Sequence, residues 1–484
     1  MTCILRGKLI LGAQGIMKKN NKIESNLKIL FYTHNLRTFR STLIGYLYEI
    51  TQVYSTILLS EELDFETEEI LKNKKIFPKL EKIIPIHQFT GPKMNLFVKN
   101  NYLFQLAKNL IKQYSPNIVI AGNDVFPFEM YLMRFAKKIN ALSISMQPYI
   151  GATHLDAMLK SVDLTNVYTI FPSFLPNWLS LFFIKIRRYL GHFLYYWILP
   201  LLVGEKPFFG KSSFILRRGL HGMMVADFEI VFSRRDYSIY CDVYKKYGIS
   251  IEKLYILSHP LVRKSRKFFQ SIYFNKAKKN KTHTKIISLM LSGEIEIGFR
   301  RKDQSLITIQ NREEMWIEIV KLINKVLYGW KIFVKPHPET KNMDKMKEIL
   351  ELISENVKVV DSQEPADKYI EVSDIVVGLP LSASNSLFFA SLQCPGKSII
   401  SLDFHQEILG DMYKDFPGII YFDNKDDFIG VLELIKKDDY NIKNKINKKN
   451  IGEIKTIEFA DAVKMLEYLF KNKKLKNETF INKS

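Results

Sequence analysis

Short runs of β-branched and aromatic residues alternate with helical patterns along this chain, and the alternation limits the folds open to it. Residues 27–32 and 117–122 are predicted strands, and residues 43–50 and 128–139 are the helices predicted to follow them. Strands separated by helices lie parallel in one sheet with helices on both faces. The first half is therefore expected to be Rossmann-like, although it lacks the Gly-x-Gly-x-x-Gly turn of dinucleotide cofactor sites.

A second series of the same kind begins at residues 286–291, and the helix predicted at 312–328 follows it. A chain of 484 residues is too long for one ordinary core, so two α/β domains with doubly wound parallel sheets are predicted. We divide the chain into a disordered leader (1–26), an N-terminal Rossmann-like domain (27–262), a lysine-rich linker (263–284), a C-terminal Rossmann-like domain (285–456), and a C-terminal helix with a basic tail (457–484).

Residues 162–216 break the α/β pattern with a stretch rich in aromatic residues, which we interpret as a helical insertion in the first domain. Lys185, Arg187 and Arg188 divide its apolar run, so neither half reaches the length of a membrane-spanning helix. A helix pair lying in the membrane interface and a buried helical insertion are equally compatible with this composition. A spanning hairpin is the least favoured of the three interpretations.

The predicted strand at residues 332–334 ends abruptly in the sequence Lys335-Pro336-His337-Pro338. Each proline removes a backbone donor and forces the preceding residue toward an extended conformation, so the strand must stop there. Lys335 and His337 are thus expected at the carboxyl end of a strand, where ligands bind in open α/β sheets. A cation and an imidazole at this edge suit a phosphate group.

A predicted strand at residues 373–380 likewise leads into a turn, which contains Ser382, Ser384 and Ser386. Ser384 is a plausible N-cap of the next helix, and the N-terminus of a helix favours anions. Ser292 and Gly293 follow the strand at 286–291, where small residues permit the close approach of a ligand.

The run Val334-Lys335-Pro336-His337-Pro338 resembles the His-Pro motif of bacterial sialyltransferases and related capsular polysaccharide transferases, and residues 381–388 resemble their serine-rich motif. The resemblance implies a GT-B fold, in which two domains face each other across a cleft, and a nucleotide-sugar glycosyltransferase. It implies that His337 and either Ser382 or Ser384 contact the donor phosphate. The remaining donor-binding candidates are Lys335, Pro338, Ser386, Ser292 and Gly293.

The sequence departs from these families at two places. Phe388 and Phe389 occupy the region where related transferases often carry a glutamate for the ribose. The acidic pair followed by glycine, which supplies the base in sialyltransferases, has no counterpart in the N-terminal half.

Asp124 directly follows a predicted strand and is our candidate for the general base, together with His337 as a catalytic residue. The alternative for Asp124 is a cap of the next helix. Four further residues are candidates for the acceptor site or the cleft, namely His34, Arg37, Gln147 and His154. For the arginine, solvation of a helix face is an equally good interpretation.

The formal net charge of +21 and the isoelectric point near 9.5 call for an anionic partner, either a nucleic acid or an anionic membrane. No nucleic-acid motif is present, so we favour the membrane surface. The three cysteines have neither metal-site nor disulfide spacing, which suits a reducing cytoplasmic compartment. We expect neither a metal nor a cofactor.

These features together predict a metal-independent GT-B glycosyltransferase, peripherally associated with the cytoplasmic face of the cell membrane. Its partners would be a nucleotide-sugar donor and a surface-glycan acceptor such as a capsule or lipopolysaccharide precursor. One alternative is a polyol-phosphate transferase of the teichoic-acid type, and another is a non-catalytic nucleic-acid-binding protein.

Overall fold

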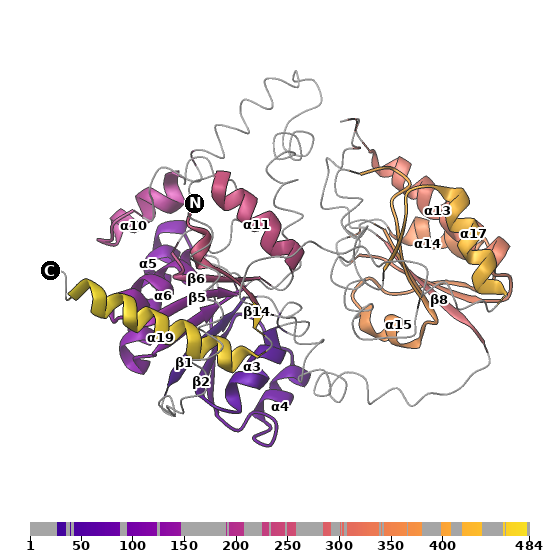
Figure 1. Ribbon diagram of the computed structural model, residues 1–484. Coiled ribbons are helices and arrows are strands. Elements are labelled where there is room, and N and C mark those ends of the chain that lie inside the picture. The colour runs from indigo at the N-terminus through magenta and orange to yellow at the C-terminus, as the bar shows by residue number, and fades with distance from the viewer. Residues whose placement is uncertain are drawn as a thin grey trace, which may run out of the picture.

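The computed structural model of the chain consists of two lobes, each built on one parallel β-sheet (Figure 1). It describes residues 27–34, 39, 43–87, 94–122, 126–146, 190, 193–207, 225–231, 234–246, 249–257, 284–291, 301, 303, 307–337, 340, 343–364, 366–379, 398–407, 419–437, 458–459 and 461–481. The predicted fold class, two α/β domains with doubly wound parallel sheets, is confirmed.

The first lobe holds an eight-stranded sheet in the order β14-β7-β6-β5-β4-β1-β2-β3, and its neighbouring strands are all parallel. The strands are β1 (Lys28–Thr33), β2 (Ser55–Ser60), β3 (Leu80–Pro85), β4 (Ile118–Ala121), β5 (Leu142–Met146), β6 (Phe228–Val231), β7 (Leu254–Leu257) and β14 (Glu458–Phe459). The strand order reverses between β1 and β4, which defines a topological switch point.

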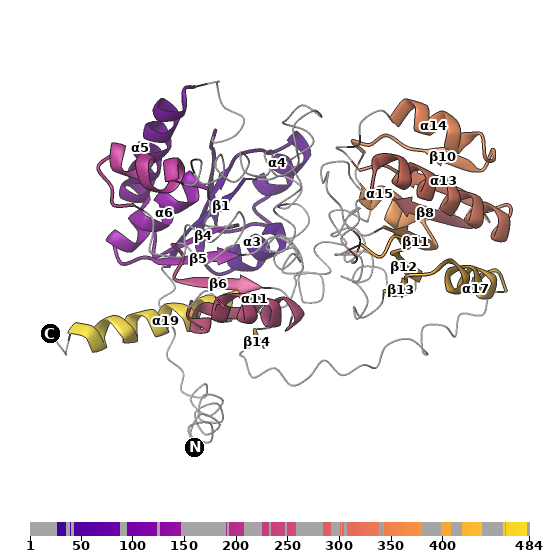
Figure 2. The same cartoon turned by 90° about the horizontal axis from the view of Figure 1, so that it is seen from above.

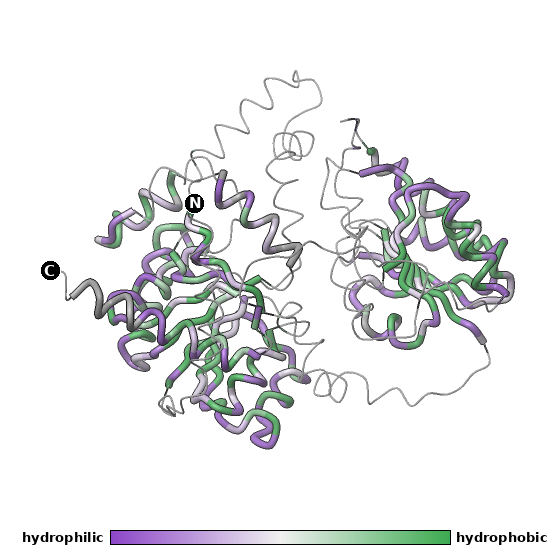
Figure 3. The backbone as a smooth tube through the Cα atoms, in the orientation of Figure 1, coloured by the Kyte–Doolittle hydropathy of each residue, from purple (hydrophilic) through white to green (hydrophobic). Residues whose placement is uncertain are grey.

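Helices cover both faces of this sheet (Figure 2). They are α3 (Ile44–Thr51), α4 (Phe65–Lys72), α5 (Leu96–Tyr114), α6 (Pro127–Lys138), α11 (Arg234–Lys246) and α19 (Ala462–Ile481). In β1, Ile29 and Phe31 pack in the core shared with α3 and α19, whereas Leu30 and Tyr32 pack in the core shared with α5 and α6. Burial on both faces explains why residues 29–32 of this strand are hydrophobic without alternation. Hydrophobic segments gather in the interior of each lobe (Figure 3).

The second lobe holds a six-stranded parallel sheet in the order β10-β9-β8-β11-β12-β13, with its switch point between β8 and β11. Its strands are β8 (Ile286–Met290), β9 (Lys331–Lys335), β10 (Val357–Val359), β11 (Ile375–Gly378), β12 (Ser398–Leu402) and β13 (Ile420–Phe422). Its helices are α13 (Ile309–Val326), α14 (Met343–Glu351), α15 (Ala366–Val372) and α17 (Lys425–Lys436). Thr308 and Asn311 form a reciprocal capping box that begins α13.

The described part of the aromatic insertion contains a short π-helical turn, η2 (Leu194–Ile198), that continues into α10 (Leu199–Leu202). The amide of Asn100 on α5 donates to the carbonyl oxygen of Leu199 (3.0 Å), which fixes this segment to the first lobe. Leu199 is buried, whereas Leu201 and Leu202 are exposed. Within the described residues, no helix has both the length and the apolar character needed to cross a membrane.

The chain returns to the first lobe at its end, where β14 pairs with β7 and α19 packs in the core of that lobe. A helix was expected to begin at residue 457; instead, residues 458–459 form β14 beside β7, and α19 begins at Ala462. The helix then continues to Ile481, through most of the segment expected to be a basic tail. The hydroxyl of Tyr54 donates to Glu467 (2.9 Å) and helps to hold α19 in place.

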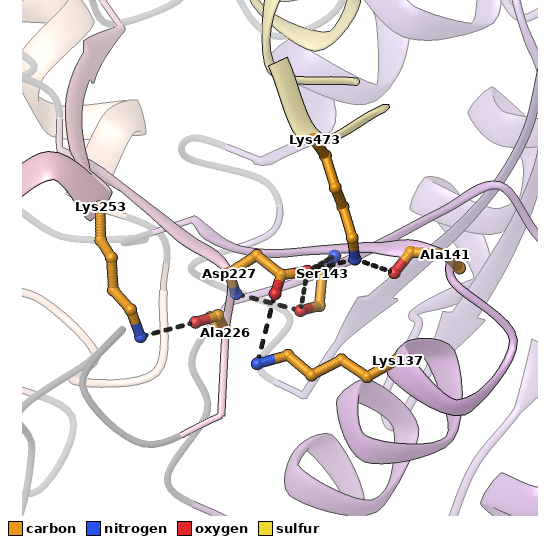
Figure 4. Close-up of polar contacts among 7 residues, drawn as sticks. All are labelled: Lys137, Ala141, Ser143, Ala226, Asp227, Lys253 and Lys473. Atoms are coloured by element: carbon orange, nitrogen blue, oxygen red, sulfur yellow. Dashed lines mark hydrogen bonds and ion pairs between the residues drawn. The ribbon is translucent and has the colours of Figure 1, made fainter. Parts of the chain in front are cut away.

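Asp227, just before β6, is the centre of the main polar attachment of α19 (Figure 4). Lys473 of α19 donates to Asp227 Oδ2 (2.8 Å) and to the carbonyl oxygen of Ala141 (2.7 Å). The backbone and the hydroxyl of Ser143 also donate to Asp227 (both 2.9 Å), and Lys137 Nζ lies 3.3 Å from it. Burial opposes ionisation of Asp227, but the two lysines outweigh it and hold its pKa below the ordinary value.

Lys473→Met should destabilise the protein by about 1–2 kcal/mol, because it leaves a largely buried carboxylate with one cation fewer. The depressed pKa means that the ion pair contributes above the ordinary aspartate value of about 4 and is lost as the pH falls below it. Urea unfolding at pH 7 and near pH 3 should therefore show a difference from wild type that shrinks in acid. Lys464→Met, on an exposed position of α19, is the control, and equal effects of both variants would contradict the assignment.

Candidate functional site

The carboxyl ends of β1 and β2 bring two titratable residues to the switch-point edge of the first lobe. Thr33 is level with Ser60 in the parallel ladder, and His34 and Glu61 are the next residues of their chains. The backbone N–H of Glu61 donates to the carbonyl oxygen of Thr33 (3.0 Å), which extends the pairing beyond the strands. Ligands bind at this edge of doubly wound sheets, so its ionisable groups are candidates for function.

A third ionisable residue, Glu129, reaches the same edge from the helix that follows β4. It lies in the first turn of α6, which begins at Pro127. Its Oε1 is 3.7 Å from Nδ1 of His34, and its side chain is fully buried while that of His34 is 15% exposed. The ring of Phe126 packs edge-on against the imidazole, with 5.5 Å between ring centroids. The sequence placed His34 at this edge, whereas Glu129 was not identified.

In the second lobe, three strands end level with one another at the corresponding edge. Met290 of β8 is in register with Lys335 of β9 and with Gly378 of β11. The backbone N–H of Leu291 donates to the carbonyl oxygen of Lys335 (3.0 Å), and that of Leu379 donates to Met290 (3.3 Å). Backbone hydrogen bonds therefore continue past the ends of the strands and hold the first residues that follow them. Binding sites are built on backbone held in this way.

Lys335 is buried, with 4% of its surface exposed. Its ammonium group donates to the carbonyl oxygen of Pro336 (2.8 Å) and to that of Ser362 (2.7 Å), which lies after β10. The lysine thus fastens the loop after β9 to the loop after β10. A contact between Lys335 and a donor phosphate stays a prediction.

His337 is half-buried and follows directly on this fastened loop. Its carbonyl oxygen accepts a hydrogen bond from the backbone N–H of Thr340 (3.0 Å). The structure therefore confines His337 to the carboxyl edge of the sheet. Its proposed contact with phosphate is not tested by this geometry.

A buried polar network at the ends of β12 and β13 was not identified from the sequence. Asp403 accepts hydrogen bonds from the backbone of Glu407 (2.8 Å) and from the hydroxyl of Tyr421 (2.9 Å). Arg312, in the first turn of α13, lies 3.7 Å from the carboxylate of Glu407. Nearby, burial lowers the pKa of His405, and neighbouring cations lower it further. The network ties α13 to the same edge that carries Lys335.

Ten of the predicted site residues lie outside the described residues, so their roles stay predictions. They are Asp124, Arg37, Gln147 and His154 in the first domain, and Ser292, Gly293, Pro338, Ser382, Ser384 and Ser386 in the second. Within the described ranges, no group of three or more histidine, cysteine or acidic side chains is arranged to hold a metal ion.

Comparison with solved structures shows the family of folds to which this arrangement is similar. A protein of Listeria monocytogenes described as a UDP-N-acetylglucosamine 2-epimerase matches with a TM-score of 0.50 and 10% sequence identity, over 86% of this chain and 90% of that one. The UDP-GlcNAc 2-epimerase of Methanocaldococcus jannaschii matches with a TM-score of 0.49 and 12% identity, over 92% and 99%. A glycosyltransferase of Rickettsia africae matches with a TM-score of 0.44 and 14% identity, over 86% and 88%.

The first of these likenesses establishes a GT-B-like fold, and at 10% identity it establishes the fold alone. The two scores below 0.5 carry no separate argument. Neither the models of known families nor the curated proteins gave a match to this sequence.

Lys335→Met should lower the free energy of unfolding by about 1–3 kcal/mol, because methionine fills the same space but leaves two carbonyl oxygens without their donor. Urea denaturation measures the change. Lys331→Met, at the exposed opposite end of β9, is the matched control and should have little effect. A Lys335→Met variant as stable as wild type would show that the ammonium group does not fasten the loop.

Proposed function

We propose that this protein is a GT-B glycosyltransferase that moves a sugar from a nucleotide-sugar donor to a bacterial surface-glycan acceptor. The observation that carries the proposal is the second lobe, where a strand ending in Lys335, Pro336 and His337 reaches the switch-point edge of a parallel sheet. The GT-B-like fold and the resemblance of the His-Pro and serine-rich motifs support the same activity.

Loss of the nucleotide from the donor sugar places negative charge on a phosphate oxygen. Hydrogen-bond donors fixed in advance at that position stabilise the transition state, because they need no reorganisation during the reaction. His337 follows a loop held by Lys335, so its position is set before the donor arrives. In this proposal, Ser382 and Ser384 supply further donors, and Ser292, Gly293, Pro338 and Ser386 complete the donor site.

Epimerisation of UDP-N-acetylglucosamine at C2 is a second candidate, favoured by the activity named for the Listeria protein of similar fold. Both candidates need a site for the nucleotide phosphates, but their products differ. We would incubate the protein with UDP-N-acetylglucosamine and no acceptor, and follow the sugar signals by NMR. Accumulation of the C2 epimer would replace the transferase proposal by the epimerase.

His337→Ala should reduce sugar transfer by at least about 100-fold, an effect typical of losing a preorganised donor to a developing oxyanion. The change removes a half-buried side chain at a strand end, so the fold should be retained. A panel of nucleotide sugars screened by thermal shift would identify the donor, and transfer from that donor would then be measured. His87→Ala, at an exposed position after β3, is the control. Wild-type turnover by a folded His337→Ala protein would overturn the assignment of the donor site.

We further propose peripheral association with the anionic cytoplasmic face of the membrane, where a lipid-linked acceptor would be presented. Leu201 and Leu202 of α10 are 53% and 61% exposed, and Phe193 before η2 is 41% exposed. The bond between Asn100 and Leu199 places them beside α5, whose first turn exposes Phe97 and Val98. Apolar side chains of this kind enter an interface, and the net charge of +21 favours an anionic leaflet.

Changing Leu201 and Leu202 together to serine should weaken binding to vesicles that contain anionic lipid. The expected loss is several-fold, because each leucine would bury part of its apolar surface in the interface. Cosedimentation with vesicles measures it, and salt should release part of the wild-type protein. Leu352→Ser changes a leucine that is 86% exposed in the second lobe and should bind as wild type does. Equal binding by all three proteins would contradict this surface.

A further inference from the structure

The ion pair between His34 and Glu129 has the composition of an acid–base unit, and the two residues lie 95 positions apart in sequence. The fold brings them together because β1 and β4 are neighbours in the sheet and α6 follows β4. The position is the topological switch point of the first lobe. The pairing therefore places an imidazole at the edge where this class of sheet binds ligands.

Glu129 is suited to be the charged member of the pair. Its side chain is fully buried, and a buried carboxylate is costly unless cations or dipoles stabilise it. The residue lies in the first turn of α6, where the helix dipole favours negative charge. A carboxylate at this point attracts positive charge on the nearby ring, so it stabilises the protonated form of His34.

The geometry also assigns different tasks to the two ring nitrogens of His34. Nδ1 faces Glu129 at 3.7 Å, and Phe126 packs edge-on against the ring. A carboxylate beside one nitrogen favours a proton on that nitrogen, which leaves the lone pair of neutral imidazole on the other. Nε2, across the ring from Nδ1, is thus the nitrogen that accepts a proton from a substrate.

We propose that His34 is the general base of the transfer reaction and that Glu129 is its positioning residue, an inference that rests on the proposed glycosyltransferase function. Nε2 of His34 takes the proton of the acceptor hydroxyl as that oxygen forms a bond to the anomeric carbon. The bond between the anomeric carbon and the donor phosphate oxygen breaks, and its electron pair leaves with the nucleotide. Glu129 stabilises the imidazolium formed in this step.

Other charged groups at the same edge enter the pH dependence of the base. Glu61, after β2, is buried and follows a residue in register with Thr33, so it is a second acidic residue at the edge that carries His34. Glu129 supplies the negative charge from α6, and Phe126 contributes no charge. Asp124, the base predicted from the sequence, lies outside the described residues and is the competing candidate.

The kinetic test compares His34→Ala and Glu129→Gln with wild type, and with the His87→Ala control. His34→Ala should lower kcat by about 100- to 10,000-fold, the usual range for losing a general base, with unchanged donor affinity. Glu129→Gln keeps the shape of the side chain but removes its charge. It should move the acid limb of the kcat profile to lower pH, because the imidazole loses a group that stabilises its protonated form. Wild-type kcat in His34→Ala would overturn the proposal and favour Asp124.

A second measurement separates this inference from the proposed function. Nitrogen-15 NMR of the histidine-labelled full chain reports the tautomer and the titration of His34, which is assigned from its absence in His34→Ala. We expect a protonated Nδ1 in the neutral ring of wild type, and titration at lower pH in Glu129→Gln. Identical titration of His34 in both proteins would overturn the pairing even if transfer is observed. A wild-type protein that shows this coupling but transfers no sugar would refute the proposed function and the base role together, and leave the pairing as a structural ion pair.

Discussion

Both sheets of this protein are parallel and buried on their two faces, and the rest of the structure depends on that constraint. Parallel strands need a crossing connection between each pair, and helices supply it while they cover the apolar faces. All carboxyl ends of the strands then lie along one edge of each sheet. Residues far apart in sequence therefore lie close together at this edge.

The two edges of the first sheet are used in different ways. The carboxyl edge carries three ionisable residues near the switch point, namely His34, Glu61 and Glu129. At the opposite edge, before β5 and β6, Lys473 and Asp227 hold α19 on the lobe. A fully paired cluster stabilises the assembly, whereas an imidazole that remains 15% exposed beside a buried carboxylate is suited to exchange protons. The groups that hold α19 and the groups proposed for proton transfer thus lie at opposite ends of the strands.

Much of the fold follows from the sequence, since buried strands such as β1, β8 and β11 are short runs of mostly apolar residues. β3 was missed because Glu81 and Lys82 are exposed at the edge of the sheet and interrupt its apolar pattern. β14 has two residues, too few to give any pattern. These elements depend on long-range pairing, which a local pattern does not contain.

The site was predictable only in part, for the same reason. The prolines beside Lys335 and His337 predicted a strand end at these residues. They did not indicate that the ammonium group of Lys335 donates to the carbonyl oxygen of Ser362. Glu129 lies in the first turn of an amphipathic helix, where a glutamate is usually a solvated charge. Its burial beside His34 comes from the packing of α6 against the sheet, and no residue near it in sequence signals this partner.

We propose that a nucleotide binds at the carboxyl edge of the second sheet, where β8, β9 and β11 end. Hydrogen–deuterium exchange of the whole protein, with and without saturating nucleoside diphosphates and monophosphates, tests it most directly. We expect one nucleotide to slow exchange in peptides that cover the carboxyl ends of β8, β9 and β11, and to leave exchange at the opposite ends of these strands unchanged. Protection confined to the opposite edge of the sheet, or no protection by any nucleotide, would contradict it.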